Sequence, residues 1–319
     1  MKKNIVFGGQ GFIGQNLCSQ LIKNGESVVS IDKNIWGLKF SDFCIESNNF
    51  SYYNQDINSL DYSVLPIIEI CAKEDIFVWH LAANSDILKG VYNIDIDLND
   101  TLMTTINIMK FMEKFKLENI IFASSSAVYG KILNKATEDT PTRPISNYGG
   151  MKLASEAVLS AFQQKHGGNC IISRFPNVVG TPATHGVILD LIKKLQKNET
   201  ALNVLGNGQQ NKNYLHVDDL ISSLLHLRDL PKHNIFDVYN IGGEGPNVYV
   251  KDIAERVRDT LNPNALINYQ ETEEGWVGDV PKIELSMKKI NATGWKNSMS
   301  GLKAIQKTIT DILTSKKQL

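Results

Sequence analysis

The feature that most constrains the fold is a glycine-rich turn near the start of the chain. A short apolar stretch of strand type, residues 4–7, runs into residues 8–14 (GGQGFIG), and the apolar spacing that follows is helical. Gly9, Gly11 and Gly14 fit the pattern G-x-G-x-x-G, whereas Gly8, Gly11 and Gly14 fit the wider G-x-x-G-x-x-G. With either spacing, the backbone can approach a pyrophosphate at the amino end of a helix.

An acidic residue in the right place strengthens this interpretation. Residues 27–31 read as a second strand, and Asp32 follows at its carboxyl end. A carboxylate there accepts hydrogen bonds from a ribose hydroxyl and repels a 2′-phosphate, so NAD is favoured over NADP. The alternative is a tight structural turn followed by a solvated aspartate.

Strand and helix patterns then alternate as far as residue 175. This alternation predicts an α/β fold with a Rossmann-type, doubly wound parallel sheet. Residues 77–83 form a continuous apolar run, as expected for a strand buried on both faces, so we expect His80 to be a core histidine rather than a catalyst. Asp56 follows the third strand, where it can accept from an adenine amino group or cap the next helix. The remaining predicted strands are 52–57, 119–123, 170–174 and 236–243, and the predicted helices are 98–115, 148–166 and 299–313.

Tyr148 and Lys152 are the candidates for acid–base chemistry. Residues four apart on a helix share a face, and an ammonium group beside a phenol favours the phenolate. We therefore expect Lys152 to lower the pKa of Tyr148 and make it a usable base. Ser124, Ser125 and Ser126 end the fifth strand, at the sheet edge where ligands bind in parallel folds. The alternative for Tyr148 and Lys152 is an exposed helix pair without function.

Composition excludes several other classes. The 319 residues are 42% hydrophobic and 21% charged with a net charge of −1, which argues against a general nucleic-acid or anionic-membrane surface. The chain has no apolar run near the roughly 18 residues that a membrane span needs, and we expect no metal site. The four cysteines, Cys18, Cys44, Cys71 and Cys170, are scattered, which indicates reduced thiols in a cytoplasmic protein.

Further motifs line up with these in the order of a known family. They are residues 80–83 (HLAA), 125–130 (SSAVYG) and 174–180 (RFPNVVG). With them, the chain resembles an extended short-chain dehydrogenase/reductase of the NAD-dependent epimerase/dehydratase family. It is most similar to nucleotide-sugar 4-epimerases of the UDP-glucose 4-epimerase type.

The resemblance implies roles for the catalytic residues. Tyr148 takes the proton of the sugar 4-hydroxyl, Lys152 lowers its pKa and holds the nicotinamide ribose, and Ser125 occupies the family's catalytic Ser/Thr position. The 4,6-dehydratases carry Asp-Glu directly after that position. Here Ser126 and Ala127 stand there, and neither protonates a leaving 6-hydroxyl.

The motifs and the resemblance together name the binding residues. The expected NAD contacts are Gly8, Gly11, Phe12, Ile13, Gly14, Asp32, Asp56, Ile57, Leu81, Ala82, Ala83, Tyr148, Lys152 and Pro176. The expected substrate contacts are Asn84, Ser125, Ser126, Tyr148, Asn177, Val187, Lys212 and Trp276. Three positions depart from the family pattern: Thr101 replaces an Asn, and Lys212 and Trp276 each replace an Arg that binds the diphosphate.

We expect two domains and a nucleotide-sugar substrate. Residues 1–175 form the NAD-binding Rossmann domain, with returning segments near 212–243, and residues 176–319 form a smaller, mainly substrate-binding domain. The family pairs subunits through two helices, here 98–115 and 148–166, so the resemblance implies a homodimer. The expected activity is NAD-dependent 4-epimerisation; the alternatives are a nucleotide-sugar 4-dehydrogenase or 4-keto reductase, and a dinucleotide-binding regulator without turnover.

Overall fold

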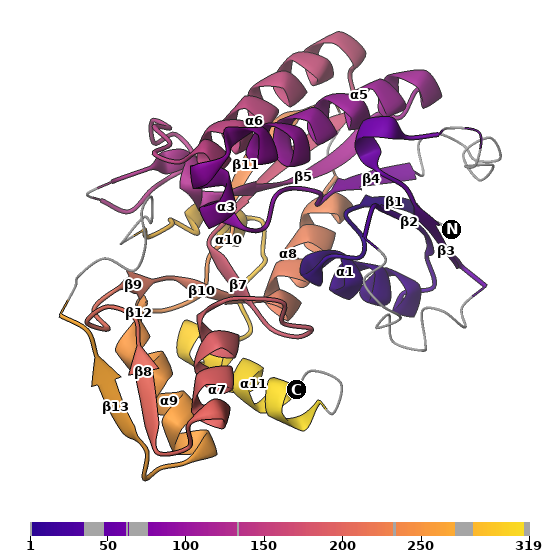
Figure 1. Cartoon of the computed structure of the whole chain (residues 1–319). Coiled ribbons are helices and arrows are strands. Elements are labelled where there is room, and N and C mark those ends of the chain that lie inside the picture. The colour runs from indigo at the N-terminus through magenta and orange to yellow at the C-terminus, as the bar shows by residue number, and fades with distance from the viewer. Residues whose placement is uncertain are drawn as a thin grey trace. The chain divides into compact units, whose positions relative to one another are not determined.

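The computed structural model describes residues 2–34, 48–61, 63, 76–132, 134–231, 234–271 and 283–315. These residues divide into two compact units, each built from three stretches of chain (Figure 1). The first unit contains Met1–Val128, Thr142–Arg174 and Leu224–Tyr239, and the second contains Tyr129–Pro141, Phe175–Ser223 and Asn240–Leu319.

A seven-stranded sheet organises the first unit. Its order is β11-β6-β5-β4-β1-β2-β3, and the β1–β2, β1–β4, β2–β3 and β4–β5 pairs are parallel. From β1, the strands β2 and β3 follow on one side of the sheet, and β4, β5 and β6 follow on the other. The switch point, where doubly wound sheets bind ligands, therefore lies between β1 and β4. The predicted fold class is confirmed. The strands are β1 (Lys3–Phe7), β2 (Ser27–Asp32), β3 (Phe50–Asn54), β4 (Ile76–His80), β5 (Asn119–Ser125), β6 (Asn169–Phe175) and β11 (Phe236–Asn240).

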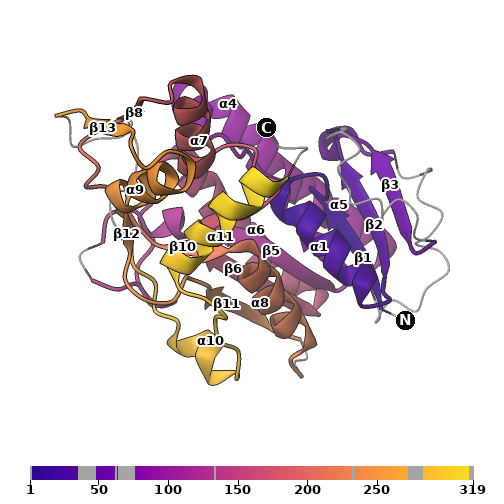
Figure 2. The same ribbon diagram turned by 90° about the horizontal axis from the view of Figure 1, so that it is seen from below.

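Helices cover both faces of this sheet. Helices α5 and α6 lie on one face and α1 lies on the other, as two views show (Figures 1 and 2). The helices and turns are α1 (Phe12–Lys23), η1 (Ile57–Ser59), α3 (Ile87–Tyr92), α4 (Ile94–Asp97), η5 (Leu98–Met103), α5 (Thr104–Phe115), η6 (Ser126–Tyr129) and α6 (Asn147–His166). Helix α8 (Val217–Asp229) contributes its second half to this unit.

Two local differences from the predicted elements matter for the site. The third strand ends at Asn54 rather than Ile57, so Asp56 caps the short helix η1 instead of ending a strand. The predicted helix 98–115 begins with the π-helical turn η5 before α5 continues it. Such turns are rare and occur often at functional sites.

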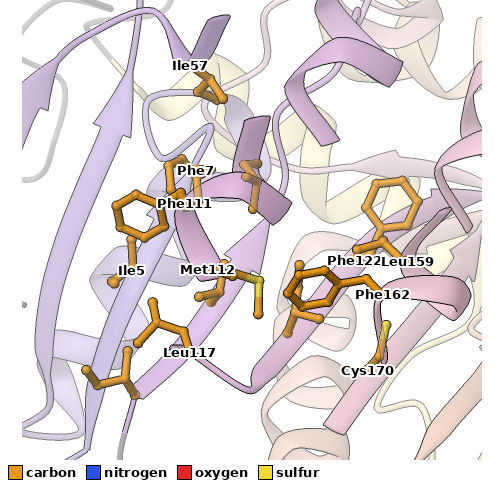
Figure 3. Packing of buried hydrophobic residues seen from close by; sticks show 14 of the residues in the cluster. Ile5, Phe7, Ile57, Phe111, Met112, Leu117, Phe122, Leu159, Phe162 and Cys170 are labelled. Carbon is orange, nitrogen blue, oxygen red and sulfur yellow. The ribbon is translucent and has the colours of Figure 1, made fainter. Parts of the chain in front are cut away.

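The core of the first unit joins the central strands to α5 and α6 (Figure 3). Phe7 and Phe122 are fully buried on the sheet, and Phe111 of α5 meets Phe7 edge-on with ring centroids 5.3 Å apart. Leu159 and Phe162 of α6 belong to the same cluster of buried hydrophobic side chains. Burial of each such side chain contributes roughly 1.5–3 kcal/mol, so the helix that carries Tyr148 and Lys152 is firmly attached to the sheet.

The second unit has its own core and small two-stranded sheets. Helices α7 (Val187–Lys197), α9 (Val250–Leu261) and α11 (Gly301–Thr314) pack their apolar faces together, and α10 (Lys288–Ala292) is short. The strands are β7 (Asn177–Val179), β8 (Ala201–Val204), β9 (Asn211–Lys212), β10 (Tyr214–His216), β12 (Val248–Tyr249) and β13 (Leu266–Tyr269), paired as β10–β7, β12–β9 and β13–β8. In neither unit does any described helix have the length and apolar character needed to cross a membrane.

Candidate active site

The glycine turn lies at the switch point between β1 and β4. Gly8 adopts a φ of +83°, which favours glycine, and a Cβ there would lie 2.6 Å from the backbone nitrogen of Ala82. The Gly8 N–H donates to the carbonyl of Ile31 at 2.9 Å, and the Leu81 N–H donates to that of Phe7 at 2.9 Å. The turn is therefore packed against the ends of β2 and β4 and leaves no room for a side chain.

The amino end of α1 fits an anionic group. Gly11 is the N-cap residue and is exposed, no side chain caps the helix, and the first turn contains no acidic residue. The first amide N–H groups of a helix have no partner inside the helix, and the helix dipole favours negative charge there. Phe12 and Ile13, both expected NAD contacts, supply N–H groups of this first turn. The arrangement is the one that a pyrophosphate requires.

Asp32 is fixed at the end of β2 by backbone donors. The Gln10 N–H donates to its Oδ2 at 3.0 Å, and the Asn34 N–H donates to its Oδ1 at 2.9 Å. Burial raises the pKa of Asp32, while these two bonds and the charge of Lys33 lower it. Each carboxylate oxygen still has a lone pair with which to accept from a hydroxyl. Asp32 therefore suits a ribose.

The residues after β3 have structural partners of their own. Asp56 accepts a hydrogen bond from the Asn58 N–H at 2.9 Å, so the capping interpretation applies, and an adenine contact remains an additional prediction. Ile57 is 6% exposed and belongs to the core cluster.

The segment after β4 carries Ala82, Ala83 and Asn84. The two alanines are partly buried, and their small side chains fit a position at which a cofactor lies against the chain. Asn84 is buried, and its Nδ2 donates to Asp97 at 2.8 Å and to the Asp86 carbonyl at 2.9 Å. Both of its N–H groups are therefore used within the protein, and only its oxygen, which accepts from the Asp86 N–H, can also accept from a substrate.

The structure brings Ser125, Tyr148 and Lys152 together. Ser125 ends β5, Tyr148 lies in the first turn of α6, and the Ser125 hydroxyl acts to lower the pKa of Tyr148. A Cβ on Gly149 would lie 2.7 Å from the carbonyl oxygen of Ala127, so the helix lies directly against the turn η6. Ser126 is buried in that turn.

The charges in the site differ from the expectation. Lys152 is 2% exposed, and its Nζ donates to the Ala123 carbonyl at 2.5 Å and lies 5.8 Å from the centre of the Tyr148 ring. Burial lowers the pKa of Lys152 to about 7, although the charge of Glu156 acts to raise it. Burial raises the pKa of Tyr148 to about 12, and the charge of Asp97 acts in the same direction. The expected lowering of the Tyr148 pKa by Lys152 is thus not found: burial raises this pKa, and the amine of Lys152 binds the main chain.

A buried ion pair behind Lys152 is absent from the sequence-based prediction. Glu156 accepts hydrogen bonds from the Nε and Nη2 of Arg174 at 2.9 and 2.6 Å, and from the hydroxyl of Ser124. Tyr148, Lys152 and Glu156 are spaced four apart, and that spacing is the signal that places Glu156 on the catalytic face of α6.

His80 is a core residue, as predicted. It is fully buried, and its Nε2 lies 2.7 Å from the Thr105 hydroxyl, which donates to Ser155 at 2.9 Å. Burial and the charge of Lys152 hold its pKa well below the ordinary value, so the imidazole is neutral. Thr101, at the family's Asn position, accepts from the Asn84 N–H at 3.2 Å.

The other expected binding residues belong to the second unit. Asn177 is exposed at the start of β7, directly after Pro176, and Lys212 lies in β9. Val187 opens α7 and packs against the core of this unit. Trp276 lies outside the described residues.

Comparisons with known proteins agree with this geometry. Residues 4–242 match the model of the NAD dependent epimerase/dehydratase family. A putative UDP-glucose 4-epimerase from Methanocaldococcus jannaschii is 29% identical over 315 residues, covering 96% of each chain. A dTDP-4-dehydro-6-deoxyglucose reductase from Escherichia coli is 26% identical over 273 residues, covering 84% of each. A crystal structure of a UDP-galactose 4-epimerase superposes with a TM-score of 0.82 at 30% identity, covering 98% of each chain.

Proposed function

The chain belongs to the NAD-dependent epimerase/dehydratase family, and we propose that it is a nucleotide-sugar 4-epimerase that oxidises and then reduces C4 of the sugar. NAD is the cofactor of this family, and the glycine turn, the open end of α1 and Asp32 fit it. One observation carries the proposal. Tyr148 lies beside Lys152 and close enough to Ser125 for that hydroxyl to act on its pKa, and the residues after Ser125 are Ser126 and Ala127, which have no acid with which to eliminate water.

The protein's own groups handle the proton. Tyr148 accepts the proton of the 4-hydroxyl during oxidation and returns it during reduction, and Ser125 holds the same oxygen. When bound, NAD supplies the group that takes a hydride from C4 and gives it back. Burial raises the pKa of Tyr148 and lowers that of Lys152, so it favours the neutral form of both groups before NAD and substrate bind.

The second unit supplies the nucleotide site in this proposal. Asn177 and Lys212 contact the diphosphate, and Val187 lines the base pocket. Lys212 keeps the positive charge of the family's arginine but not its bidentate fork. Residues 1–175, with the returning segments near 212–243, then hold NAD, and residues 176–319 mainly hold the substrate.

A 4-keto reductase or 4-dehydrogenase is the second candidate. The Escherichia coli relative is named as a reductase of a 4-dehydro sugar nucleotide, and it matches most of the chain. Such an enzyme uses the same three catalytic residues and stops after one hydride transfer.

The two candidates are separated by one experiment. The purified protein is incubated with NAD and, separately, UDP-glucose, UDP-N-acetylglucosamine, a GDP-sugar and a CDP-sugar, and the products are analysed by NMR. Formation of the C4 epimer without net NADH supports the epimerase, and Tyr148→Phe should abolish it. NADH formed in proportion to a 4-keto product selects the dehydrogenase. If no sugar changes, both epimerisation and net oxidation at C4 are refuted for these substrates.

We also propose a homodimer formed through α5 and α6, in the cytoplasm. The outward positions of α6 include Ala154, Ala157 and Ala161, small residues that allow close helix packing. Light scattering tests the assembly, because a mass near 35.6 kDa would identify a monomer.

A further inference from the structure

Thr105, in the first turn of α5, is a buried residue whose hydroxyl lies between two elements of the active site. Its exposed fraction is 0%. The Nε2 atom of His80 lies 2.7 Å from its Oγ1, and the Oγ atom of Ser155 lies 2.9 Å from it. His80 ends β4, directly before the expected NAD contacts at 81–83, and Ser155 belongs to the neighbouring catalytic helix α6 (Figure 1). One hydroxyl therefore joins the cofactor segment to the catalytic helix.

The hydrogen bonds continue into the backbone of α6. The Ser155 hydroxyl donates to the carbonyl of Met151 at 2.9 Å. Met151 lies between Tyr148 and Lys152 in the sequence, in the turn of α6 that carries both side chains. Ser155 is also 0% exposed, so water does not compete for these bonds. The Thr105 hydroxyl is thus connected to the part of α6 that performs the acid–base chemistry.

The partners of the imidazole indicate where its proton lies. The Nδ1 atom of His80 is buried and has no hydrogen-bond partner among the residues that the structure describes. An unbonded N–H is rarer in a protein interior than an unbonded acceptor, so we place the proton of the neutral ring on Nε2. His80 then donates to Thr105, whose own proton remains available for Ser155. The Thr101 carbonyl, 3.0 Å from the same hydroxyl, already accepts from the Thr104 hydroxyl at 2.8 Å.

The π-helical turn η5, directly before α5, holds the cofactor segment at a second point. The hydroxyl of Thr101, which is 0% exposed, accepts a hydrogen bond from the main-chain N–H of Asn84 at 3.2 Å. Asn84 directly follows residues 81–83. The two threonines therefore contact the cofactor segment on both sides, Thr105 through His80 before it and Thr101 through Asn84 after it.

We propose that Thr105 is a positioning residue of the active site, whose hydroxyl, between His80 and Ser155, fixes the spacing between the NAD-binding end of β4 and the catalytic helix. Apolar packing holds α5 and α6 against the sheet, but it is not directional, whereas a hydrogen bond has a preferred length and angle. Because Thr105 is fully buried, it acts through its two partners and does not itself touch a ligand.

The spacing matters because hydride transfer requires cofactor and acid–base groups in a fixed geometry. A misplacement of about 1 Å far from the chemistry can reduce a rate about 100-fold. In the proposal, NAD contacts both the end of β4 and the catalytic helix, so its affinity also depends on this spacing. The effect on NAD binding rests on the family's cofactor, whereas the effect on turnover rests on the proposed function.

Thr104, the neighbouring residue, shows how a buried threonine can serve only its own helix. It is 5% exposed, and its hydroxyl donates to the carbonyls of Thr101 at 2.8 Å and Asp100 at 3.2 Å, both in the preceding turn. Such bonds to the carbonyls three and four residues back are the local alternative for threonine in a helix. Thr104 is therefore a matched control for Thr105.

The experiment replaces each threonine by valine, which keeps the shape and removes the hydroxyl. NAD binding to the purified protein, freed of retained NAD, is measured by calorimetry, and kcat and KM are measured for C4 epimerisation. In Thr105→Val, we expect the NAD dissociation constant to rise about fivefold and kcat to fall about tenfold or more, while KM for the sugar nucleotide changes less than about twofold. Thr104→Val should change none of these values, and Thr105→Ser, which restores the hydroxyl, should restore them.

NMR of protein with ¹⁵N-labelled histidine examines the contact directly. The His80 ring is assigned as the signal missing from His80→Gln, and its Nε2 shift should change in Thr105→Val but not in Thr104→Val. An unchanged His80 signal in Thr105→Val would overturn the proposal, as would equal effects of Thr105→Val and Thr104→Val on NAD binding.

A second variant covers the case in which Thr105→Val does not fold. Ser155→Ala breaks the connection at α6 and leaves the bond between His80 and Thr105, so it should weaken NAD binding and lower kcat in the same way. No effect of Ser155→Ala on either value would overturn the proposal. Weaker NAD binding in Thr105→Val, in a protein that epimerises no sugar, would support the role of Thr105 and refute the proposed function alone.

Discussion

Removing the carboxylate of Glu156 should destabilise the protein strongly. Glu156 and Arg174 are 5% and 7% exposed, their charged atoms are 2.6 Å apart, and Ser124 donates to the same carboxylate. Glu156→Gln removes the carboxylate that faces the buried guanidinium of Arg174. It also removes the charge that acts to keep Lys152 protonated.

The expected magnitude follows from this geometry. Breaking a buried pair at one partner costs about 3–5 kcal/mol, because the other charge stays in a medium that solvates it poorly. The cost of Arg174→Met should lie toward the lower end of this range, since Glu156 then keeps the hydrogen bond from Ser124. The double variant Glu156→Leu/Arg174→Met should cost less than the sum of the two single changes, since it removes both charges of the pair.

Urea unfolding of the cofactor-free proteins, followed by circular dichroism, measures these differences. The matched control is Lys165→Met, which breaks the Lys165–Glu113 pair at 2.8 Å on the surface, where the side chains are 68% and 51% exposed. This control should leave the midpoint unchanged. If Glu156→Gln shifted the urea midpoint no more than Lys165→Met does, the buried pair would contribute no more to stability than the exposed one, and the reasoning from burial would be refuted.

Three further predictions concern the same unit. Gly149→Ala should lower the melting temperature, because its Cβ would lie 2.7 Å from the carbonyl oxygen of Ala127. Gly150→Ala has open space around its Cβ and should raise the free energy of unfolding by up to about 1 kcal/mol. Equal effects of the two substitutions would contradict the packing of α6 on Ala127. The free energy of unfolding of the wild type, relative to Lys152→Met, should rise between about pH 7 and 10.5, since the unfolded lysine binds a proton that the folded one has lost. If urea titrations gave the same difference between the two proteins at every pH, this prediction would be contradicted. Burial and Glu156 raise the pKa of the Cys170 thiol, so peptide mapping should find it alkylated only after unfolding.

The sequence was sufficient for the sheet and for the residues gathered at its edge. The strands were predictable because residues 5–7 and 77–79 are apolar without a break, and the glycine spacing is typical of a turn between a strand and a helix. The Tyr148 helix was predictable within one residue of its start. Such signals are local, so a sequence displays them directly.

The sequence did not predict which way a side chain points on its helix or which residues from distant parts of the chain it contacts. The spacing of Tyr148 and Lys152 shows that they share a helical face, but not that the amine binds the Ala123 carbonyl. Asp97 lies in the polar stretch 93–100 (NIDIDLND), where it resembles any solvated aspartate. Only the contacts with Asn84 and Gly90, which come from other elements, distinguish it from Asp95.

The interleaving of the two units has a consequence for how the chain folds during synthesis. The outermost strand of the large sheet, β11, comes from Phe236–Asn240, so about three quarters of the protein must leave the ribosome before that sheet is complete. Until then β6 presents an unpaired edge, which is a site for wrong pairing or chaperone binding. A nascent chain arrested before residue 236 should therefore be protease-sensitive and prone to aggregation, although it already contains every residue proposed for catalysis.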